Sequence, residues 1–446
     1  MDRSTLAHGI GGAKDLPISP ELAIAGAVAA LTISFTVLAL AWRTPRFDAA
    51  TSGRPAPRLQ ALVDAPWFGL ATRTFGMLLF VYTLLVAVVG KDLLTNPFFG
   101  MFYVLLWVGL IPASLLLGPV WKTISPVRTI NAGFARLAGS DAESGMYDYP
   151  RRVGYWPAAV SLFAFVWLEL VYPYSTELGP VRLWFAAYVA AMLIGGALFG
   201  NRFYAYGDPF EVFSTLVSKL SVWGRRRTPG GRGPGLLVVR MPLANLDTVV
   251  AAPGLVGVMA VLFGSTAFDS FKDSSRWVRF VQSSSISTSL LNNLALLAFC
   301  LAVGAVFAIG TMATGVSKDA RRSELPALFA HSIVPIIVGY FFAHYLTYFV
   351  EQGQITLIQM SDPLSRGDNL LGTGNWSVNF WLSFHPTFLA NSKVVGVVIG
   401  HVLGVIAAHD RAVKLLPPRH QLTGQLPLLF TMVGFTVGGL YLLFAA

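Results

Sequence analysis

The chain is poor in cysteine and in charge. Its single cysteine, Cys300, lies in an apolar run, which excludes a disulfide framework, a cysteine-based zinc site and an iron–sulfur cluster. Charged residues make up only 12% of the 446 residues, which is about half the share usual in soluble proteins. These shortages exclude a cytosolic enzyme, a disordered protein and a fibrous repeat. The sequence also has no GxxxxGK[ST] loop after a predicted strand, so nothing indicates a nucleotide-driven motor.

Apolar sequence is abundant instead. Hydrophobic residues account for 54% of the chain, and the mean hydropathy is +0.62. A helix needs about 20 apolar residues to cross the hydrocarbon core of a bilayer. We therefore predict an all-α integral membrane protein with about ten transmembrane helices, near 21–42, 70–90, 98–118, 156–173, 183–201, 247–267, 290–314, 328–350, 393–409 and 427–445.

The basic residues indicate an orientation for these helices. The net charge is +10, and arginine outnumbers lysine 24 to 8, mostly in loops between apolar runs. If the amino terminus is outside, the five inner loops hold 22 Lys and Arg and the outer segments hold nine. Since cytoplasmic loops are enriched in basic residues, both termini are predicted to lie outside. The same pattern indicates contact with anionic lipid headgroups, and no folded basic domain is long enough to bind nucleic acid.

The domain organisation follows from the predicted spans. Residues 1–20 are predicted to form an extracytoplasmic tail, and residues 21–445 form a single transmembrane helical domain. The longest inner loop is the basic segment 202–246, and the longest outer loop is 351–392. No separate soluble domain is therefore expected.

Two inner loops begin with the same kind of helix start. In Ser125-Pro126 and in Asp208-Pro209, a capping residue precedes a proline at the first helical position. After Asp208, apolar residues recur at helical spacing while polar residues take the other face. This pattern predicts amphipathic helices that lie in the inner headgroup layer.

Few ionisable residues fall inside the predicted spans. A charged group in hydrocarbon costs about 2.5 kcal/mol or more, so such groups usually have partners or a function. Glu169, Asp269, His344 and His401 are of this kind, and the two histidines are expected at one depth in the outer half of the membrane. Imidazole and carboxylate ligands suit zinc, manganese or iron, and a bound metal can activate water. The alternative is that these residues are hydrogen-bonded groups that hold helices together.

Short matches over nearly the whole chain carry a family resemblance. They are Ala7-His8-Gly9-Ile10-Gly11-Gly12, Asp15-Leu16-Pro17, Gly264-Ser265-Thr266, Phe268-Asp269, His331-Ser332, Ala343-His344-Tyr345, Gln352-Gly353-Gln354, Ser361-Asp362-Pro363-Leu364, Gly400-His401-Val402 and Ala408-His409-Asp410-Arg411. In these segments the chain resembles bacterial, largely actinobacterial, polytopic membrane proteins labelled fenitrothion hydrolase. The resemblance implies a bacterial plasma-membrane protein that hydrolyses an organophosphate triester.

Two leading hypotheses use the same residues. In the first, the chain is a membrane-embedded hydrolase in which His344, His401 and His8 hold a divalent metal, Asp269 and Glu169 act in catalysis, and a lipophilic small molecule enters from the bilayer. In the second, it is a multi-pass transporter that uses these residues as a proton or ion relay. A haem- or copper-binding subunit and a structural membrane subunit are further alternatives.

Overall fold

A computed structural model of the chain describes residues 13–226, 235–315, 320–417, 421 and 423–444. Helices form nearly all of the regular structure in this part, which confirms the predicted all-α class. The strands there are β1 (Arg54–Pro55), β2 (Trp223–Arg226) and β3 (Leu236–Val239), which form one antiparallel sheet in the order β1-β3-β2.

Eight helical segments among the described residues are long and apolar enough to cross a membrane. They are α2 (Pro20–Ala41), α4 (Pro66–Val88), α10 (Leu178–Phe199), α14 (Leu255–Lys272), α16 (Thr288–Met312), the composite segment Arg322–Gln359, α21 (Pro386–Leu415), and η7 (Thr423–Gln425) with α22 (Leu426–Phe444). A bent pair of helices over 97–117 would make a ninth, and α9 (Trp156–Leu170) is an apolar helix of 15 residues. The helices support a multi-pass membrane protein, and the count of ten stays a prediction.

Two of these segments contain π-helical stretches. The bent pair consists of α5 (Pro97–Phe99), the π-helical η2 (Gly100–Val108) and α6 (Leu110–Leu117), with a bend of 42° between η2 and α6. The composite segment consists of η3 (Arg322–Glu324), α17 (Leu325–Phe329), η4 (Ala330–Ile333), α18 (Val334–Thr347), the π-helical η5 (Tyr348–Gln352) and α19 (Gly353–Gln359). η2 and η5 contact each other. π-helical stretches are rare and are frequent at functional sites. The contact of η2 with η5 therefore marks this part of the bundle as a candidate functional region.

The shorter helices connect and cap the bundle. They are η1 (Ala13–Asp15), α3 (Pro57–Val63), α7 (Val120–Ile124), α8 (Pro126–Leu137), α11 (Asn201–Gly207), α12 (Pro209–Ser218), α13 (Pro242–Leu246), α15 (Ser275–Ser283) and α20 (Trp381–Phe384).

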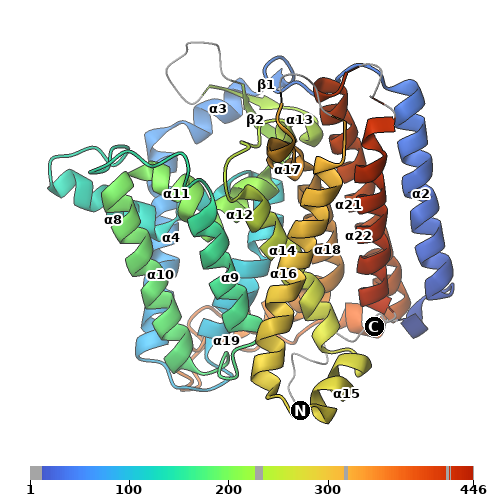
Figure 1. The fold of residues 1–446 in the computed structure, drawn as a ribbon. Coiled ribbons are helices and arrows are strands. Elements are labelled where there is room, and N and C mark those ends of the chain that lie inside the picture. Colours follow the sequence, from blue (N-terminus) through green and yellow to red (C-terminus); the bar gives the residue numbers. More distant parts are fainter. Residues whose placement is uncertain (1–12, 227–234, 316–319, 418–420, 422, 445–446) are drawn as a thin grey trace.

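The long helices form two groups (Figure 1). The first helix group comprises α4, η2–α6, α9 and α10, with α8 and α11 at one end. The second helix group comprises α2, α14, α16, α18, α21 and α22, among which α18–α21, α14–α16 and α2–α21 are extensive contacts. The two groups meet along α9–α14, α12–α18 and η2–η5. Any site between α9 and α14 therefore lies between the two groups.

Large apolar side chains are exposed around the bundle. Leu22 on α2 is 62% exposed, Leu78 on α4 64%, Leu183 on α10 72% and Leu301 on α16 63%. Water would not favour so much exposed apolar surface, whereas lipid chains would cover it. The outward faces of both helix groups are therefore suited to a bilayer.

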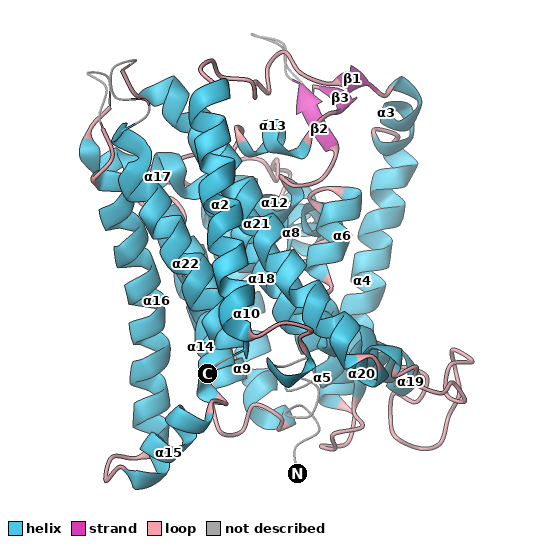
Figure 2. Cartoon of the chain, turned by 90° about the vertical axis from the view of Figure 1, so that its right-hand side faces the viewer, coloured by secondary structure: helices cyan, strands magenta, loops and turns pink. Residues whose placement is uncertain are grey.

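The basic loops lie at one end of the bundle, and the start of α2 and the end of α22 lie at the other. The three strands, α3 and α13 gather at one end, here called the sheet end, and α15, α19 and α20 lie at the other (Figure 2). At the sheet end, the Arg225 guanidinium donates to Asp64 at 2.5 Å and holds the pKa of that carboxyl below its usual value. α2 begins and α22 ends at the other end, here called the terminal end (Figure 1). Which of the two ends faces the outside of a membrane stays a prediction.

The predicted place of the helix after Asp208 is wrong. Asp208 caps α12 as predicted, since its Oδ1 accepts the Phe210 amide at 3.0 Å. However, nearly every residue of α12 is buried, and α12 contacts α6, α7, α9 and α18 instead of lying in a headgroup layer. The reason is the buried ion pair of Glu211 with Arg128 of α8, at 2.5 Å, which supplies a protein partner for the polar face. α8 itself exposes Phe134 and Leu137, as an interfacial helix would.

α18 and α21 cross closely where both carry glycine. A methyl group on Gly400 would lie 2.6 Å from the Pro335 carbonyl oxygen, and one on Gly339 would lie 2.5 Å from the Gly396 carbonyl oxygen. Small residues at such crossings let two helices approach to backbone contact. The crossing fixes the register of the pair: Gly400 is level with Pro335 to Gly339.

Candidate functional site

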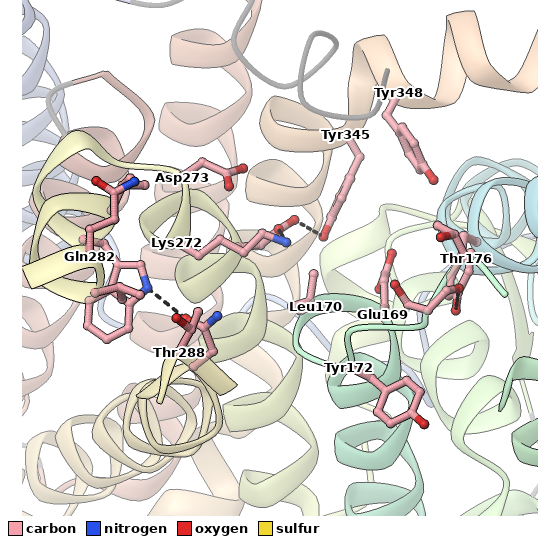
Figure 3. A pocket seen from close by; sticks show the side chains of 17 residues that line it. Glu169, Leu170, Tyr172, Thr176, Lys272, Asp273, Gln282, Thr288, Tyr345 and Tyr348 are labelled. Carbon is pink, nitrogen blue, oxygen red and sulfur yellow. Dashed lines mark hydrogen bonds and ion pairs between the residues drawn. The ribbon is translucent and has the colours of Figure 1, made fainter. Parts of the chain in front are cut away.

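A pocket of about 640 Å³ opens at the terminal end, between the two helix groups (Figure 3). Its volume lies in the range of about 300–1,000 Å³ that is usual for small-molecule sites. We call it the acidic pocket, and its walls are Tyr103, Glu169, Leu170, Tyr172, Ser175, Thr176, Asp269, Lys272, Asp273, Trp277, Val278, Val281, Gln282, Thr288, Asn292, Tyr345 and Tyr348. Three carboxylates and one ammonium thus share a space walled mainly by aromatic and small polar groups.

Asp269 is the centre of a hydrogen-bonded cluster in one wall. The last turns of α14 carry Asp269 on the buried side, where His344 Nε2 donates to its Oδ2 at 2.8 Å. The Tyr345 hydroxyl donates to the same oxygen at 2.8 Å. The Lys272 ammonium lies 2.9 Å from the other carboxylate oxygen. Asp269 thus accepts two hydrogen bonds on Oδ2 and has an ammonium beside its other oxygen.

The hydrogen bonds continue from this cluster away from the pocket. With the proton on Nε2, His344 Nδ1 accepts from Ser270 Oγ at 3.1 Å. Ser270 Oγ also lies 3.0 Å from the Tyr340 hydroxyl. Beyond Tyr340 the packing is aromatic, since its ring meets Phe263 edge-on. The polar chain therefore begins at the pocket and ends inside the second helix group.

Glu169 faces this cluster from the first helix group. It lies one residue from the end of α9, and its side chain is partly exposed. Its Oε2 atom is buried and has no hydrogen-bond partner among the described residues. Both Asp269 and Lys272 are within electrostatic range of its carboxylate. A buried carboxylate oxygen without a partner is costly and is a strong pointer to a ligand or a proton at that position.

Both π-helical stretches supply tyrosines to the pocket. Tyr103 comes from η2 and Tyr348 from η5. Figure 3 shows Tyr345 and Tyr348 projecting from the same side above Glu169, and Tyr172 below it. The irregular turns thus place aromatic rings around the carboxylate in a way that a regular α-helical repeat would not.

α15 forms the outer wall of the pocket. This amphipathic helix follows α14 directly, and Trp277, Val278 and Val281 line the pocket from it. The Trp277 indole donates to Asn292 of α16 at 2.9 Å. This bond fixes the helix against α16, and the pocket lies between α15 and the first helix group.

Aromatic side chains close the pocket towards the sheet end. Trp107 lies one turn beyond Tyr103 on η2, and Phe341 lies one turn before Tyr345 on α18. Their rings are 5.3 Å apart between centroids, and Trp107 also meets Phe165 at 4.9 Å and Phe213 at 5.0 Å. All four are fully or almost fully buried, so they form a packed aromatic layer between the pocket and the sheet end.

The predicted metal ligands are not brought together. His401 is level with Pro335 to Gly339 on α18, whereas His344 lies at least five residues, or about 7.5 Å, further along that helix. His401 is fully buried, its Nδ1 bonds the Val397 carbonyl at 2.8 Å, and its Nε2 has no partner in the described part. His8 lies outside the described residues. In the ranges that the structure describes, no three His, Cys, Asp or Glu side chains are placed to hold a metal ion.

The structure therefore unites Asp269, His344 and Glu169 and separates His401 from them. The equal depth predicted for the two histidines is wrong because the register of α18 on α21 is set by the glycine crossing, and not by the loop between them. Two carboxylates of the segment that follows α18 have structural partners: Glu351 accepts from Ser383, and Asp362 accepts from the Arg366 and Gly367 amides, which hold its pKa below the usual value.

Sequence reasoning missed Lys272 and the tyrosines. Lys272 follows Asp269 by three positions on a helix, which is a readable spacing for an ion pair. Tyr345 adjoins His344 in sequence, but its bond to Asp269 depends on the tertiary contact of α14 with α18. Tyr103 and Tyr348 gave no signal, since nothing in their segments marks a π-helical turn.

Comparison with known proteins adds no assignment: no family model, no curated protein and no solved structure matches this chain.

Proposed function

We propose that this chain is a multi-pass transporter that exchanges a small solute for protons, with the acidic pocket as its solute site. The observation that carries the proposal is the position of Glu169, whose unpartnered carboxylate oxygen lies between the two helix groups and faces Lys272 and Asp269. Transporter sites lie where two helix bundles meet and where helices are interrupted. The bend between η2 and α6 and the contact of η2 with η5 supply such interruptions beside the pocket.

Two groups in the pocket hold exchangeable protons. Glu169 takes a proton from pocket water when no solute is present and returns it to water when a solute occupies the site. The Asp269–His344 pair is the second group, because its 2.8 Å hydrogen bond joins two side chains that can each carry a proton. The charge of a bound solute changes the proton affinity of both, which is the coupling that exchange requires. Relative motion of the two helix groups would open the aromatic closure around Trp107 towards the sheet end.

Reconstituted vesicles test this function. The full chain is inserted into vesicles that enclose a pH-sensitive dye, and choline, glycine betaine and succinate are added outside as cationic, zwitterionic and anionic probes. We expect at least one probe to move protons faster than in protein-free vesicles. If none of the three charge classes changes the internal pH, and none is itself taken up, the transport proposal is wrong.

A second candidate is ester hydrolysis, in line with the family resemblance. The observation in its favour is the chain Ser270–His344–Asp269, in which one imidazole bonds a hydroxyl and a carboxylate. The Ser270 oxygen would attack the phosphorus or carbonyl centre while His344 Nδ1 takes the hydroxyl proton, and that proton would then pass to the leaving group. Water would release the acyl or phosphoryl group from Ser270. No step uses a metal, since the described donors assemble no ligand set.

The same purified protein tests hydrolysis with p-nitrophenyl acetate and diethyl p-nitrophenyl phosphate. Release of p-nitrophenol that disappears in Ser270→Ala would favour the hydrolase. Equal release by Ser270→Ala and the unaltered chain would assign the activity to a contaminant or to solvent, and this candidate would fall.

For the membrane arrangement we propose ten spans in a bacterial plasma membrane, with both termini and the acidic pocket outside. The support is the position of the basic loops at the sheet end and of the start of α2 and the end of α22 at the terminal end (Figure 1). Cys300 is buried, so an introduced cysteine can be labelled selectively. In intact cells, Ser285→Cys at the terminal end should react with a membrane-impermeant maleimide, and Ser140→Cys at the sheet end should react only after lysis. The reverse pattern would invert the proposed orientation.

A further inference from the structure

The acidic pocket carries a charge that selects its ligand. When Glu169 has released its proton, as the proposed exchange requires for the solute-bound state, Glu169, Asp269 and Asp273 outweigh Lys272, and the formal charge of the lining is −2. The Lys272 ammonium is paired with Asp269 at 2.9 Å, so it does not neutralise Glu169 directly. A cleft lined by one sign of charge inside a protein concentrates the field, which attracts cations and repels anions.

The aromatic lining points to an organic cation and not to a bare metal ion. Tyr103, Tyr172, Tyr345, Tyr348 and Trp277 all line the pocket. The faces of such rings attract an alkylated ammonium group and need no displacement of its hydration shell by oxygen ligands. A metal ion would need a set of three or more ligands, and the described residues offer none. About 640 Å³ also exceeds what a single ion fills.

We infer that the acidic pocket binds small molecules that carry a quaternary or alkylated ammonium group, with Glu169 as the counter-ion and the tyrosines of η2 and η5 as the aromatic wall. This inference rests on the proposed function and names the class of solute for the same site. The ammonium group can belong to a free solute or to a lipid headgroup that enters between α15 and the first helix group. In both cases the pocket would recognise the same alkylated ammonium group.

Binding to the full chain tests the inference without any transport. The protein is placed in nanodiscs of phosphatidylglycerol, which has no ammonium group, and titrated calorimetrically with choline and with 3,3-dimethyl-1-butanol. The two probes have the same shape and differ in charge. Choline should bind at least about tenfold more tightly than the alcohol, since ring faces and a carboxylate act on the charge alone. Equal affinities, or no binding of choline, would overturn the inference.

Variants identify the groups responsible. Glu169→Gln and Tyr348→Leu should each weaken choline binding about tenfold and leave the alcohol unaffected, whereas Tyr348→Phe, which keeps the ring, should bind as before. Glu177→Gln, an exposed carboxylate outside the pocket, and Tyr147→Leu, an exposed tyrosine at the sheet end, are the matched controls. If the controls weaken choline binding as much as Glu169→Gln and Tyr348→Leu do, the pocket is not the site.

Two comparisons distinguish a free solute from a lipid headgroup, and the binding inference from the transport function. Nanodiscs of phosphatidylcholine should suppress choline binding if the natural ligand is a lipid headgroup and leave it unchanged if the ligand is a free solute; the preference for ammonium holds in either case. Choline binding without proton movement in vesicles would reject the transport function and keep the inference. Proton movement driven only by succinate would overturn the inference and keep the transport function.

Discussion

Asp269→Asn is expected to abolish solute-driven proton movement. The substitution keeps the size of the side chain and removes the charge that His344, Tyr345 and Lys272 share, at 2.8, 2.8 and 2.9 Å. The amide of asparagine is not an acid–base group, so the pair with His344 loses one of its two proton-carrying members. The flux in the vesicle assay should fall by at least about a hundredfold, the smallest factor usual for loss of a positioned proton-transfer group.

The same substitution also frees Lys272. Its ammonium is within electrostatic range of Glu169, and it would turn to that carboxylate once Asp269 is uncharged. A cationic solute would then compete with an internal ammonium, so solute binding should weaken together with the proton flux. A purely structural effect would instead leave the affinity of the folded fraction unchanged.

Asp368→Asn is the control for Asp269→Asn. Asp368 is an exposed carboxylate at the same end of the molecule and outside the pocket, so this variant should keep the full flux. A folded Asp269→Asn protein whose flux and pH profile equal those of the control would show that the Asp269 cluster takes no part in coupling.

Two of the three acidic residues that line the pocket could be predicted from sequence, but Asp273 was not, and the histidine partners were predicted only in part. Glu169 and Asp269 stand out because a carboxylate inside an apolar run is costly wherever the run folds. The pairing of Asp269 with His344 rests on the packing of α14 against α18. The depths predicted for the two residues in the membrane indicate this pairing only approximately. The partnership with His401 fails because one glycine crossing shifts α21 relative to α18 by several residues. The length of the loop that connects the two helices does not determine their register.

Helix starts could be predicted locally, and helix positions could not. Ser125 and Asp208 cap the helices that follow them, because capping involves neighbouring residues only. The burial of α12 depends on Arg128, which lies 83 positions before Glu211. The antiparallel pairing of Arg54 with Val239 in the sheet joins segments that are further apart still. An amphipathic pattern identifies a polar face, but only the tertiary structure shows whether water or a protein charge satisfies it.

The buried pair of Arg128 and Glu211 gives the largest expected loss of stability. Two nitrogens of Arg128 bind the two carboxylate oxygens, at 2.5 and 2.7 Å, and the Arg128 and Glu211 side chains are only 13% and 2% exposed. Arg128 also donates to the Asn201 carbonyl and lies over the Tyr204 ring. Arg128→Ala leaves the Glu211 carboxylate buried without its counter-ion, which costs about 3–5 kcal/mol in comparable cases.

Arg225→Ala is a closely matched control for that loss. Arg225 binds Asp64 through two nitrogens as well, at 2.5 and 3.1 Å, but both side chains are about 30% exposed. Water replaces the lost partner there, so the free energy of unfolding should change by about 0–1 kcal/mol. Chemical unfolding of the detergent-solubilised chain measures both variants under the same conditions. Equal losses would mean that α12 admits water, and its place inside the helix bundle would then be wrong. Replacing both members of the buried pair, as Arg128→Met with Glu211→Leu, should recover most of the loss, because the cost of Arg128→Ala lies in the isolated charge and not in the absence of attraction.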